Sequence, residues 1–213
     1  DLTPLIVSAA RKLKRVMADE QNEVLEALRR NEPVRALDAL LPSVGDHIAR
    51  YAGAISDDLL GAAQAGAGLV APTGSGPLRK ADAAAATKAA DDVLGEWLVV
   101  PLRERLERCV LDGDGDNAGI GKRVRAIYRE WKTQHIDEQL DDVLRTAHGR
   151  GVLAAIGTGT AVMWVCDPAH HGCSDCDDNS LAGSIKAGET FPTGHLCAPA
   201  HVGCRCILLP DGR

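Results

Sequence analysis

The chain has 213 residues, and its 45% hydrophobic and 25% charged content is ordinary for a globular protein with one sizeable domain and a small appendage. Aromatic residues make up only 3%, so the core must rest on Leu, Val, Ile and Ala, which suits packed helices better than a sheet sandwich. The formal net charge is -6, neither half of the chain is basic, and no apolar run approaches the roughly 20 residues that cross a bilayer, which argues against duplex-binding and membrane-spanning proteins.

The first predicted element is a helix from Thr3 to Asn31, in which apolar residues recur at helical spacing. A second, short helix is predicted from Pro33 to Leu41, and Ser43 is a candidate cap for a third helix that reaches Leu60. Residues 1–64 therefore form a predicted N-terminal helical region. The only basic cluster on these helices is interpreted as a solvated face rather than a nucleic-acid site: Arg11, Lys12, Lys14 and Arg15.

Residues 65–80 are rich in Gly, Ala, Ser and Pro, a composition typical of a flexible linker. A second helical region is predicted over residues 81–157. Its first helix runs from Asp82 to Leu111, and Pro101 is expected to kink or divide it.

The acidic segment after this helix begins like a calcium-binding loop, with Asp112, Asp114 and Asp116 at alternate positions. The sharp-turn glycine is replaced by Asn117, and the position that needs a bidentate Glu holds Arg123. We reject the calcium interpretation and expect a polar turn in which Asp116 or Asn117 caps the next helix.

The clearest helical periodicity runs from Ile120 to Ala147, and Gly149 and Gly151 are predicted to mark the end of this helix. The character of the chain changes after residue 157. Ala161–Val165 and Ile207–Leu209 are the two convincing strand candidates. If they pair antiparallel, the chain between them closes into a loop whose two ends meet.

Five metal-ligand candidates lie near the two ends of that loop. Cys173 and Cys176 form one half of a zinc-knuckle pattern, because two intervening residues let a tight turn direct both thiols at one ion. His201, Cys204 and Cys206 form the second half. Four of these five side chains would complete a tetrahedral site without an open position, which is typical of a structural zinc ion.

The cysteines also allow other interpretations. They could form disulfides or remain free thiols, although a reducing cytoplasm disfavours disulfides. Cys166 and Cys197 lie outside the ligand pattern and could pair with each other, and Cys109 is expected to be a small buried hydrophobic residue. Residues 158–213 contain few large apolar side chains, so a staple is expected to supply stability there.

The predicted fold is therefore α+β and predominantly α-helical. A helical N-terminal region is followed by a small zinc-stapled C-terminal module, residues 158–213, with a short antiparallel β-pair.

The C-terminal module resembles Mu F-like minor head proteins of tailed bacteriophages. The resemblance rests on Trp164 and on three segments: Cys173 to Gly183, Gly188 to Gly194, and Pro199-Ala-His-x-x-Cys-Arg-Cys206. It covers roughly the last fifty residues, and the helix from Lys122 to Ala147 resembles the helical segment that precedes this motif in the family. Many relatives carry a Glu in the helix before the Trp, whereas this chain reads Arg-Thr-Ala-His-Gly there, so no role of that Glu is carried over.

The resemblance implies a non-enzymatic minor capsid or head-morphogenesis protein. Its expected partners are the phage portal protein and other head proteins, with DNA contact inside the head and no membrane or small-molecule substrate. It is expected in the interior of the virion near the portal vertex, after assembly in the host cytoplasm, where it would assist genome packaging or delivery. No signal-peptide pattern is visible, and because the first residue is Asp1 we expect a processed product or a piece of a longer chain.

Two alternatives stay open. One is a plain interaction module in which residues 1–64 bind a multimeric ring such as the portal. The other is a zinc-containing nuclease or DNA-end-processing enzyme, since compact His/Cys folds can carry such activity. The motifs of zinc deaminases, HExxH metalloproteases and nucleotide-binding loops are absent from the sequence. Side chains that an enzyme could use are His170 and His171 beside Cys173, or His195, His201, Asp177 and Asn179.

Overall fold

The structure is a computed structural model that describes residues 1–30, 32–71, 76–169 and 173–212. It is predominantly α-helical with one small antiparallel sheet, so the predicted α+β class is confirmed. The chain forms two compact units. The helical unit comprises Ile6–Ser56 and Asp91–Asp141, and the C-terminal unit comprises Asp1–Leu5, Asp57–Ala90 and Asp142–Arg213.

These units do not coincide with the predicted division into 1–64, 65–80, 81–157 and 158–213. The reason is that long helices pass from one unit into the other, so each unit collects segments that are distant in the sequence.

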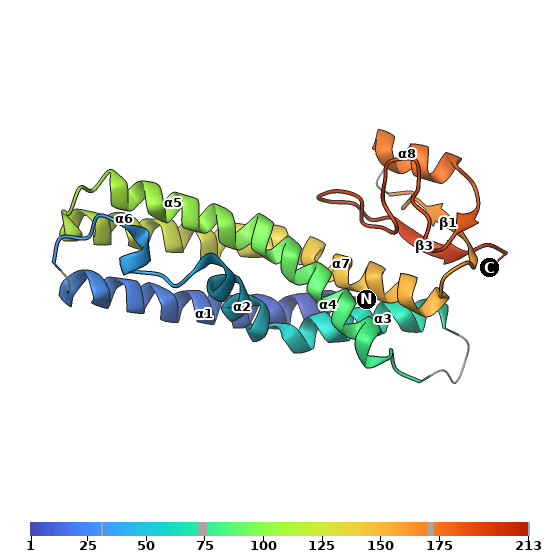
Figure 1. The fold of residues 1–213 in the computed structure, drawn as a ribbon, viewed down its shortest axis with the longest axis horizontal. Helices are drawn as coiled ribbons and strands as arrows, with labels where there is room; N and C mark the ends of the chain where they lie inside the picture. Colours follow the sequence, from blue (N-terminus) through green and yellow to red (C-terminus); the bar gives the residue numbers. More distant parts are fainter. Residues whose placement is uncertain (31, 72–75, 170–172, 213) are drawn as a thin grey trace. The chain divides into compact units, whose positions relative to one another are not determined.

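The helical unit is built from long amphipathic helices that can be followed in Figure 1. Its elements are α1 (Thr3–Arg30), the 3₁₀ turn η1 (Leu37–Ala39), α2 (Val44–Ala54), the π turn η2 (Gly95–Val99), α5 (Val100–Leu111), α6 (Asn117–Glu130) and the π turn η3 (Trp131–His135). Helix α1 buries Leu13, Met17 and Val24, which recur along one face because a helix turns every 3.6 residues. The short helix predicted from Pro33 to Leu41 is reduced to the single 3₁₀ turn η1.

Two predicted capping positions are confirmed. The Ser43 hydroxyl accepts the backbone N–H of Asp46 at the start of α2, at 3.2 Å. The Asp116 carboxylate accepts the N–H of Gly119 at the start of α6, at 3.0 Å. Asp114 pairs with Arg35 at 3.0 Å, so two of the three aspartates in the rejected calcium loop have other roles.

Pro101 lies in the first turn of α5, directly after the π turn η2, so the predicted helix changes its hydrogen-bond pattern next to this proline while the chain stays helical from Lys80 to Leu111. Proline lacks an N–H, and the bond directly before it, from the Val100 N–H to the Gly95 carbonyl, spans five residues, as in a π turn. Trp131 opens the other π turn, and its Nε1–H donates to the Leu98 carbonyl in η2 at 3.2 Å. The two irregular turns of the helical unit are therefore bonded to each other.

A polar network lies inside the helical unit around the fully buried Glu20 of α1. The hydroxyls of Tyr51 and Tyr128 donate to its Oε1 at 3.0 and 2.8 Å, and Nε2 of His47 approaches its Oε2 at 2.8 Å. Arg103 Nη1 lies 3.2 Å from His47 Nδ1; a guanidinium can only donate, so Nδ1 accepts and Nε2 carries the ring hydrogen that faces Glu20. Burial and the adjacent Glu20 charge raise the pKa of both tyrosines above the usual range.

The C-terminal unit combines helices with the sheet. Its elements are α3 (Ser56–Val70), most of α4 (Lys80–Leu94), most of α7 (Ile136–Ile156), β1 (Ala161–Val165), α8 (Ser174–Leu181), β2 (Ile185–Lys186) and β3 (Ile207–Pro210). The predicted antiparallel pairing of the first and last strands is confirmed, with Trp164 opposite Leu208 and Val165 opposite Ile207. A third strand, β2, completes the order β2-β1-β3, and α8 lies beside the sheet in Figure 1.

Helices α3 and α7 are longer than predicted. Helix α3 continues to Val70, so the first part of the predicted linker is helical, while residues 72–75 lie outside the described residues. A Cβ added at Gly66 would lie 2.0 Å from the His148 carbonyl oxygen, and one at Gly151 would lie 1.9 Å from that of Ala63. The small residues therefore serve close packing between α3 and α7 rather than flexibility.

The predicted end of α7 at Gly149 and Gly151 is wrong for the same reason, since the helix runs on to Ile156. A Cβ at Gly149 would lie 1.8 Å from the Ala198 carbonyl oxygen, so this glycine lets the C-terminal loop approach the helix backbone. In the parts of the chain that the structure describes, every helix is too short or too polar to cross a membrane.

Candidate metal centre

The first two ligand candidates are placed by the start of helix α8. Cys173 is the residue before the helix, and Cys176 is buried in its first turn. The Asp177 N–H donates to the Cys173 carbonyl at 3.0 Å, which closes this turn. Residues three apart in a helical turn face the same side, so both thiols point toward one place.

The other three candidates lie in the loop that leads into strand β3. The Cys204 N–H donates to the His201 carbonyl at 3.1 Å, which closes a tight turn. Gly203 has φ +77°, a left-handed conformation that glycine adopts without a steric penalty. Cys206 directly precedes β3, so the pairing of β3 with β1 fixes its position.

The five side chains converge. The Cys176 sulfur lies 3.2 Å from His201 Nε2 and 3.7 Å from the Cys204 sulfur. Ligand atoms lie within 4.8 Å of one another in two groups that share Cys176, one with Cys173 and His201 and the other with Cys204 and Cys206. Two sulfurs bound at about 2.3 Å to a tetrahedral ion are about 3.8 Å apart, so the distance between Cys176 and Cys204 fits one edge of such a site.

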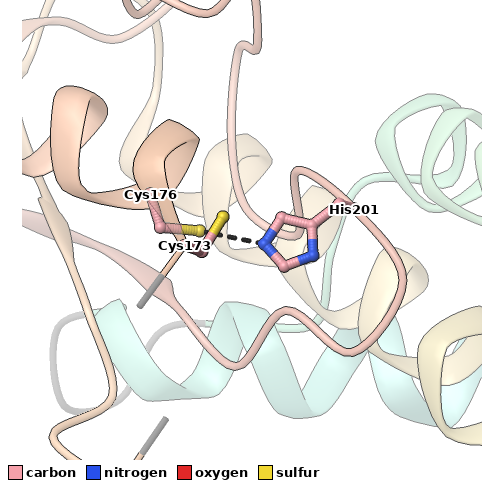
Figure 2. Close-up of side chains that lie close together, drawn as sticks. All are labelled: Cys173, Cys176 and His201. Carbon is pink, nitrogen blue, oxygen red and sulfur yellow. Dashed lines mark hydrogen bonds between the residues drawn. The ribbon is translucent and has the colours of Figure 1, made fainter. Parts of the chain in front are cut away.

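Figure 2 shows the Cys176 sulfur directed at the His201 ring, with the Cys173 sulfur beside it. His201 Nδ1 lies 2.7 Å from the Val202 carbonyl oxygen. A carbonyl can only accept, so Nδ1 carries the ring hydrogen and the lone pair of the neutral ring is on Nε2, which faces the sulfur. A backbone carbonyl that orients the non-ligating nitrogen is usual for metal-binding histidines.

The electrostatics of the cluster favour a cation. Burial, together with the neighbouring thiols, raises the pKa of Cys176 above its usual range, and burial raises the pKa of Cys204. Without a cation these groups are held as neutral thiols, and a bound metal ion would stabilise the thiolates and release their protons. The five residues could therefore hold a metal ion, and all five predicted ligand candidates lie in this one cluster.

Asp142 of helix α7 supports the second half of the cluster, and the sequence did not reveal it. Its carboxylate accepts the Gly203 N–H at 3.1 and 3.0 Å and pairs with Arg205 Nη1 at 3.0 Å. Arg205 also donates to the Cys204 carbonyl at 3.3 Å. Asp142 is 3% exposed and therefore fixes the residues on both sides of Cys204 from within the fold. Its partners are 61 and 63 residues away, and no local spacing pattern marks such a contact.

The cluster is part of the hydrophobic core of the C-terminal unit. Cys176 and Cys204 are buried together with Trp164 and Phe191, whose rings form an edge contact with centroids 5.1 Å apart. Val152 of α7 belongs to the same core. Residues 158–213, which were predicted to contain few large apolar side chains, therefore share a hydrophobic core with helices outside this segment.

The remaining cysteines lie outside the ligand groups. Cys166 is a free thiol 3.4 Å from the Cys176 carbonyl oxygen, and Cys197 is a free buried thiol, so the structure contains no bond between them. Cys109 is buried in α5, as predicted, with its sulfur 3.8 Å from the Ile120 carbonyl oxygen.

The structure brings together only some of the side chains that were considered as catalytic groups of an enzyme. His195 Nδ1 lies 2.8 Å from the Thr193 hydroxyl, which is 2.9 Å from Asn179 Oδ1. Asp177 lies on the exposed side of α8. His170 and His171 lie outside the described residues.

Comparisons with known proteins identify no relative: no family model, no curated protein and no solved structure matches the chain.

Proposed function

We propose that the chain is a structural, non-catalytic minor head protein of a tailed bacteriophage, similar to the Mu F-like group, and that its C-terminal module is held together by zinc. The observation that carries the proposal is the convergence of Cys173, Cys176, His201, Cys204 and Cys206. These residues belong to the stretch that resembles the family motif.

Zinc is the metal that the donor set favours. Thiolate and imidazole ligands in tetrahedral arrangement select zinc over magnesium and calcium, which prefer oxygen. Five donors for four positions leave no place for a reactive water, and this supports a structural rather than a catalytic ion. The bound ion would supply charge neutralisation to the buried thiolates, while Asp142 and the Val202 carbonyl orient the ligands.

The proposed partners are the portal protein and other head proteins, and the proposed location is the interior of the virion near the portal vertex. Two measurements test these proposals. Elemental analysis of the purified protein, with mass spectrometry of its thiols, should find about one equivalent of zinc and unlinked cysteines. Mass spectrometry of gradient-purified particles of the encoding phage should find the chain enriched relative to the host lysate. Its absence from the particles would refute the head assignment without touching the zinc site.

A nuclease is the second candidate, because one observation favours it. Asn179 Oδ1 accepts the backbone N–H of Thr193 at 3.2 Å, so this atom is the amide oxygen, and the Thr193 hydroxyl donates to it. The single hydroxyl hydrogen is then used, so His195 Nδ1 must donate to Thr193 and Nε2 is left with the lone pair that a general base requires. Cleavage of plasmid DNA that is lost in His195→Ala, with the zinc content unchanged, would support this candidate. No cleavage with magnesium, manganese or zinc would end it.

A further inference from the structure

Helices α5 and α6 of the helical unit line a solvent-open pocket of about 330 Å³. Its lining includes three exposed arginine side chains, Arg105 and Arg108 from α5 and Arg123 from α6, and we call it the arginine pocket. The lining is completed by two acidic and three smaller or apolar side chains: Asp112, Glu130, Cys109, Ala126 and Ile127.

The fold separates charges that alternate along α5. The sequence of this helix runs Arg103-Glu-Arg105-Leu-Glu107-Arg108, which averages to almost no net charge. In the structure, Glu104 and Glu107 line a different cavity together with Arg103, whereas Arg105 and Arg108 line the arginine pocket. A count of charges along the chain therefore conceals a local basic site.

Among the residues that the structure describes, these three arginines form no ion pair, unlike other arginines of the helical unit. Arg35, Arg50 and Arg103 bond to a carboxylate or a backbone carbonyl at 3.0 Å or less. Within the described residues, no carboxylate forms an ion pair with Arg105, Arg108 or Arg123, although Asp112 and Glu130 line the same pocket. The guanidinium of Arg123 is held over the α5–α6 turn, where its Nη2 would lie 3.1 Å from a Cβ built on Gly113.

The positive surface continues along α6. Helices α5 and α6 together carry seven Lys or Arg and three Glu, in a chain with 24 basic and 30 acidic residues. Lys122, Arg125 and Arg129 are exposed at helical spacing, a row about 10 Å long. Such a row can meet more than one charge of a polyanion, because duplex DNA carries one negative charge per about 1.7 Å of its axis.

We infer that the arginine pocket binds a phosphate of a nucleic-acid backbone, independently of the base sequence. Guanidinium groups offer forked donors that match phosphate oxygens, and three unpaired forks around one pocket suit a single phosphate group. The cations along α6 then contact neighbouring phosphates of the same strand. Asp112 and Glu130 limit the affinity and confine the contact to the pocket and the row. This inference does not depend on the metal centre.

The test uses the full chain with its metal, and fluorescence anisotropy of a labelled duplex of mixed sequence at several salt concentrations. We expect binding at about 50 mM salt that weakens steeply as salt rises and is equal for unrelated sequences. The triple variant R105Q/R108Q/R123Q should lose about tenfold or more in affinity and show a salt slope reduced by about one to three.

The matched control is R11Q/R15Q/R29Q, which removes the same charge from exposed positions of α1 in the same unit. Its affinity should change much less. The charge-retaining variant R105K/R108K/R123K should bind with intermediate affinity, because Lys keeps the charge without the fork. Circular dichroism of each variant checks that it remains folded.

Three results would overturn the inference. They are no binding by the wild-type chain at low salt, equal losses in the two glutamine variants, and equal binding of an acidic polyglutamate peptide of the same net charge as the duplex. Displacement of the duplex by millimolar inorganic phosphate alone would identify free phosphate as the source of the anion and would likewise exclude a nucleic acid.

Discussion

The two units of the protein treat their interior polar groups differently. In the helical unit, Glu20 receives hydrogen bonds from Tyr51 and Tyr128 and a close contact from His47, so its charge is satisfied by the protein itself. In the C-terminal unit, sulfur and imidazole groups that could hold a metal ion lie within 4.8 Å of one another in two groups that share Cys176.

The two units therefore differ in whether side chains of the protein or a bound ion would balance the buried polar groups. A buried polar network is stabilising when every member has a partner and destabilising when one is missing. In the helical unit, Tyr51 and Tyr128 donate to Oε1 of Glu20, and His47 Nε2 lies 2.8 Å from its Oε2, so the groups around Glu20 are matched by side chains. The candidate ligands of the C-terminal unit would be matched by a bound cation, so we expect the stability of this unit to depend on metal and that of the helical unit not to.

The largest expected effect is metal removal. Because binding of structural zinc supplies about 10–16 kcal/mol in small zinc domains, stripping the metal, or Cys173→Ser with Cys176→Ser, should disorder the C-terminal module. Near-ultraviolet circular dichroism of Trp164 should be lost while helix content falls only modestly. Cys109→Ser, a substitution in the helical unit, is the control, and this variant should still bind metal in the C-terminal module. If the Trp164 signal persists after complete chelation, the C-terminal module does not depend on metal for its folded structure.

The next largest effect is expected on the stability of the helical unit. Glu20→Ala removes the acceptor of two buried hydroxyls and should lower the free energy of unfolding by about 3–5 kcal/mol, measured with urea. Glu23→Ala breaks only an ion pair with Arg50, in which Glu23 is 60% exposed, and should cost less than about 1 kcal/mol. Equal losses in the two variants would show that the network does not stabilise the unit.

Alkaline pH should weaken the helical unit through the tyrosines. The folded pKa of Tyr51 and of Tyr128 is raised, so the folded state holds two protons that the unfolded state releases above about pH 10. Stability is then full below that pH and falls as pH rises, by up to about 2.7 kcal/mol per pH unit for both groups. Tyr128→Phe should halve the slope of unfolding free energy against pH, and an unchanged slope would remove the tyrosines as its cause.

The smallest effect sharpens the ligand geometry. Asp142→Asn should reduce zinc affinity about 10- to 100-fold, because supporting groups of metal ligands typically contribute that much. Competition with a chromophoric chelator measures the change. Asp137→Asn is a matched control, since Asp137 pairs with Lys14 in the helical unit. Zinc affinity unaltered by Asp142→Asn would mean that the turn at Gly203 holds Cys204 without help.

Local patterns predicted much of the fold. Periodicity gave the long helices, and the apolar segments at residues 161–165 and 207–209 gave the central pair of the sheet. Strand β2 escaped prediction because two residues between turns carry no periodic signal. The glycines of α3 and α7 were misread because their role depends on backbone atoms from distant parts of the sequence.

The candidate site divides in the same way. The candidate ligands were predictable because metal chemistry restricts both residue type and spacing, as in Cys173 and Cys176. The supporting carboxylate of Asp142 and the pocket formed by Arg105, Arg108 and Arg123 were not predictable. Both depend on which face of a helix a charged residue occupies in the folded chain.

The glycine contacts between α3, α7 and the C-terminal loop have a consequence for the order of folding. Each of Gly66, Gly149 and Gly151 weakens an isolated helix by about 1 kcal/mol relative to alanine. Gly66 and Gly151 can be packed as soon as α3 and α7 meet, whereas the stretch around Gly149 should remain weakly helical in a nascent chain until the segment around Ala198 has been synthesised and can dock. Gly149→Ala would raise helicity in a peptide yet destabilise the complete protein. The part of α7 around Gly149 should therefore fold only after the C-terminal segment has been synthesised.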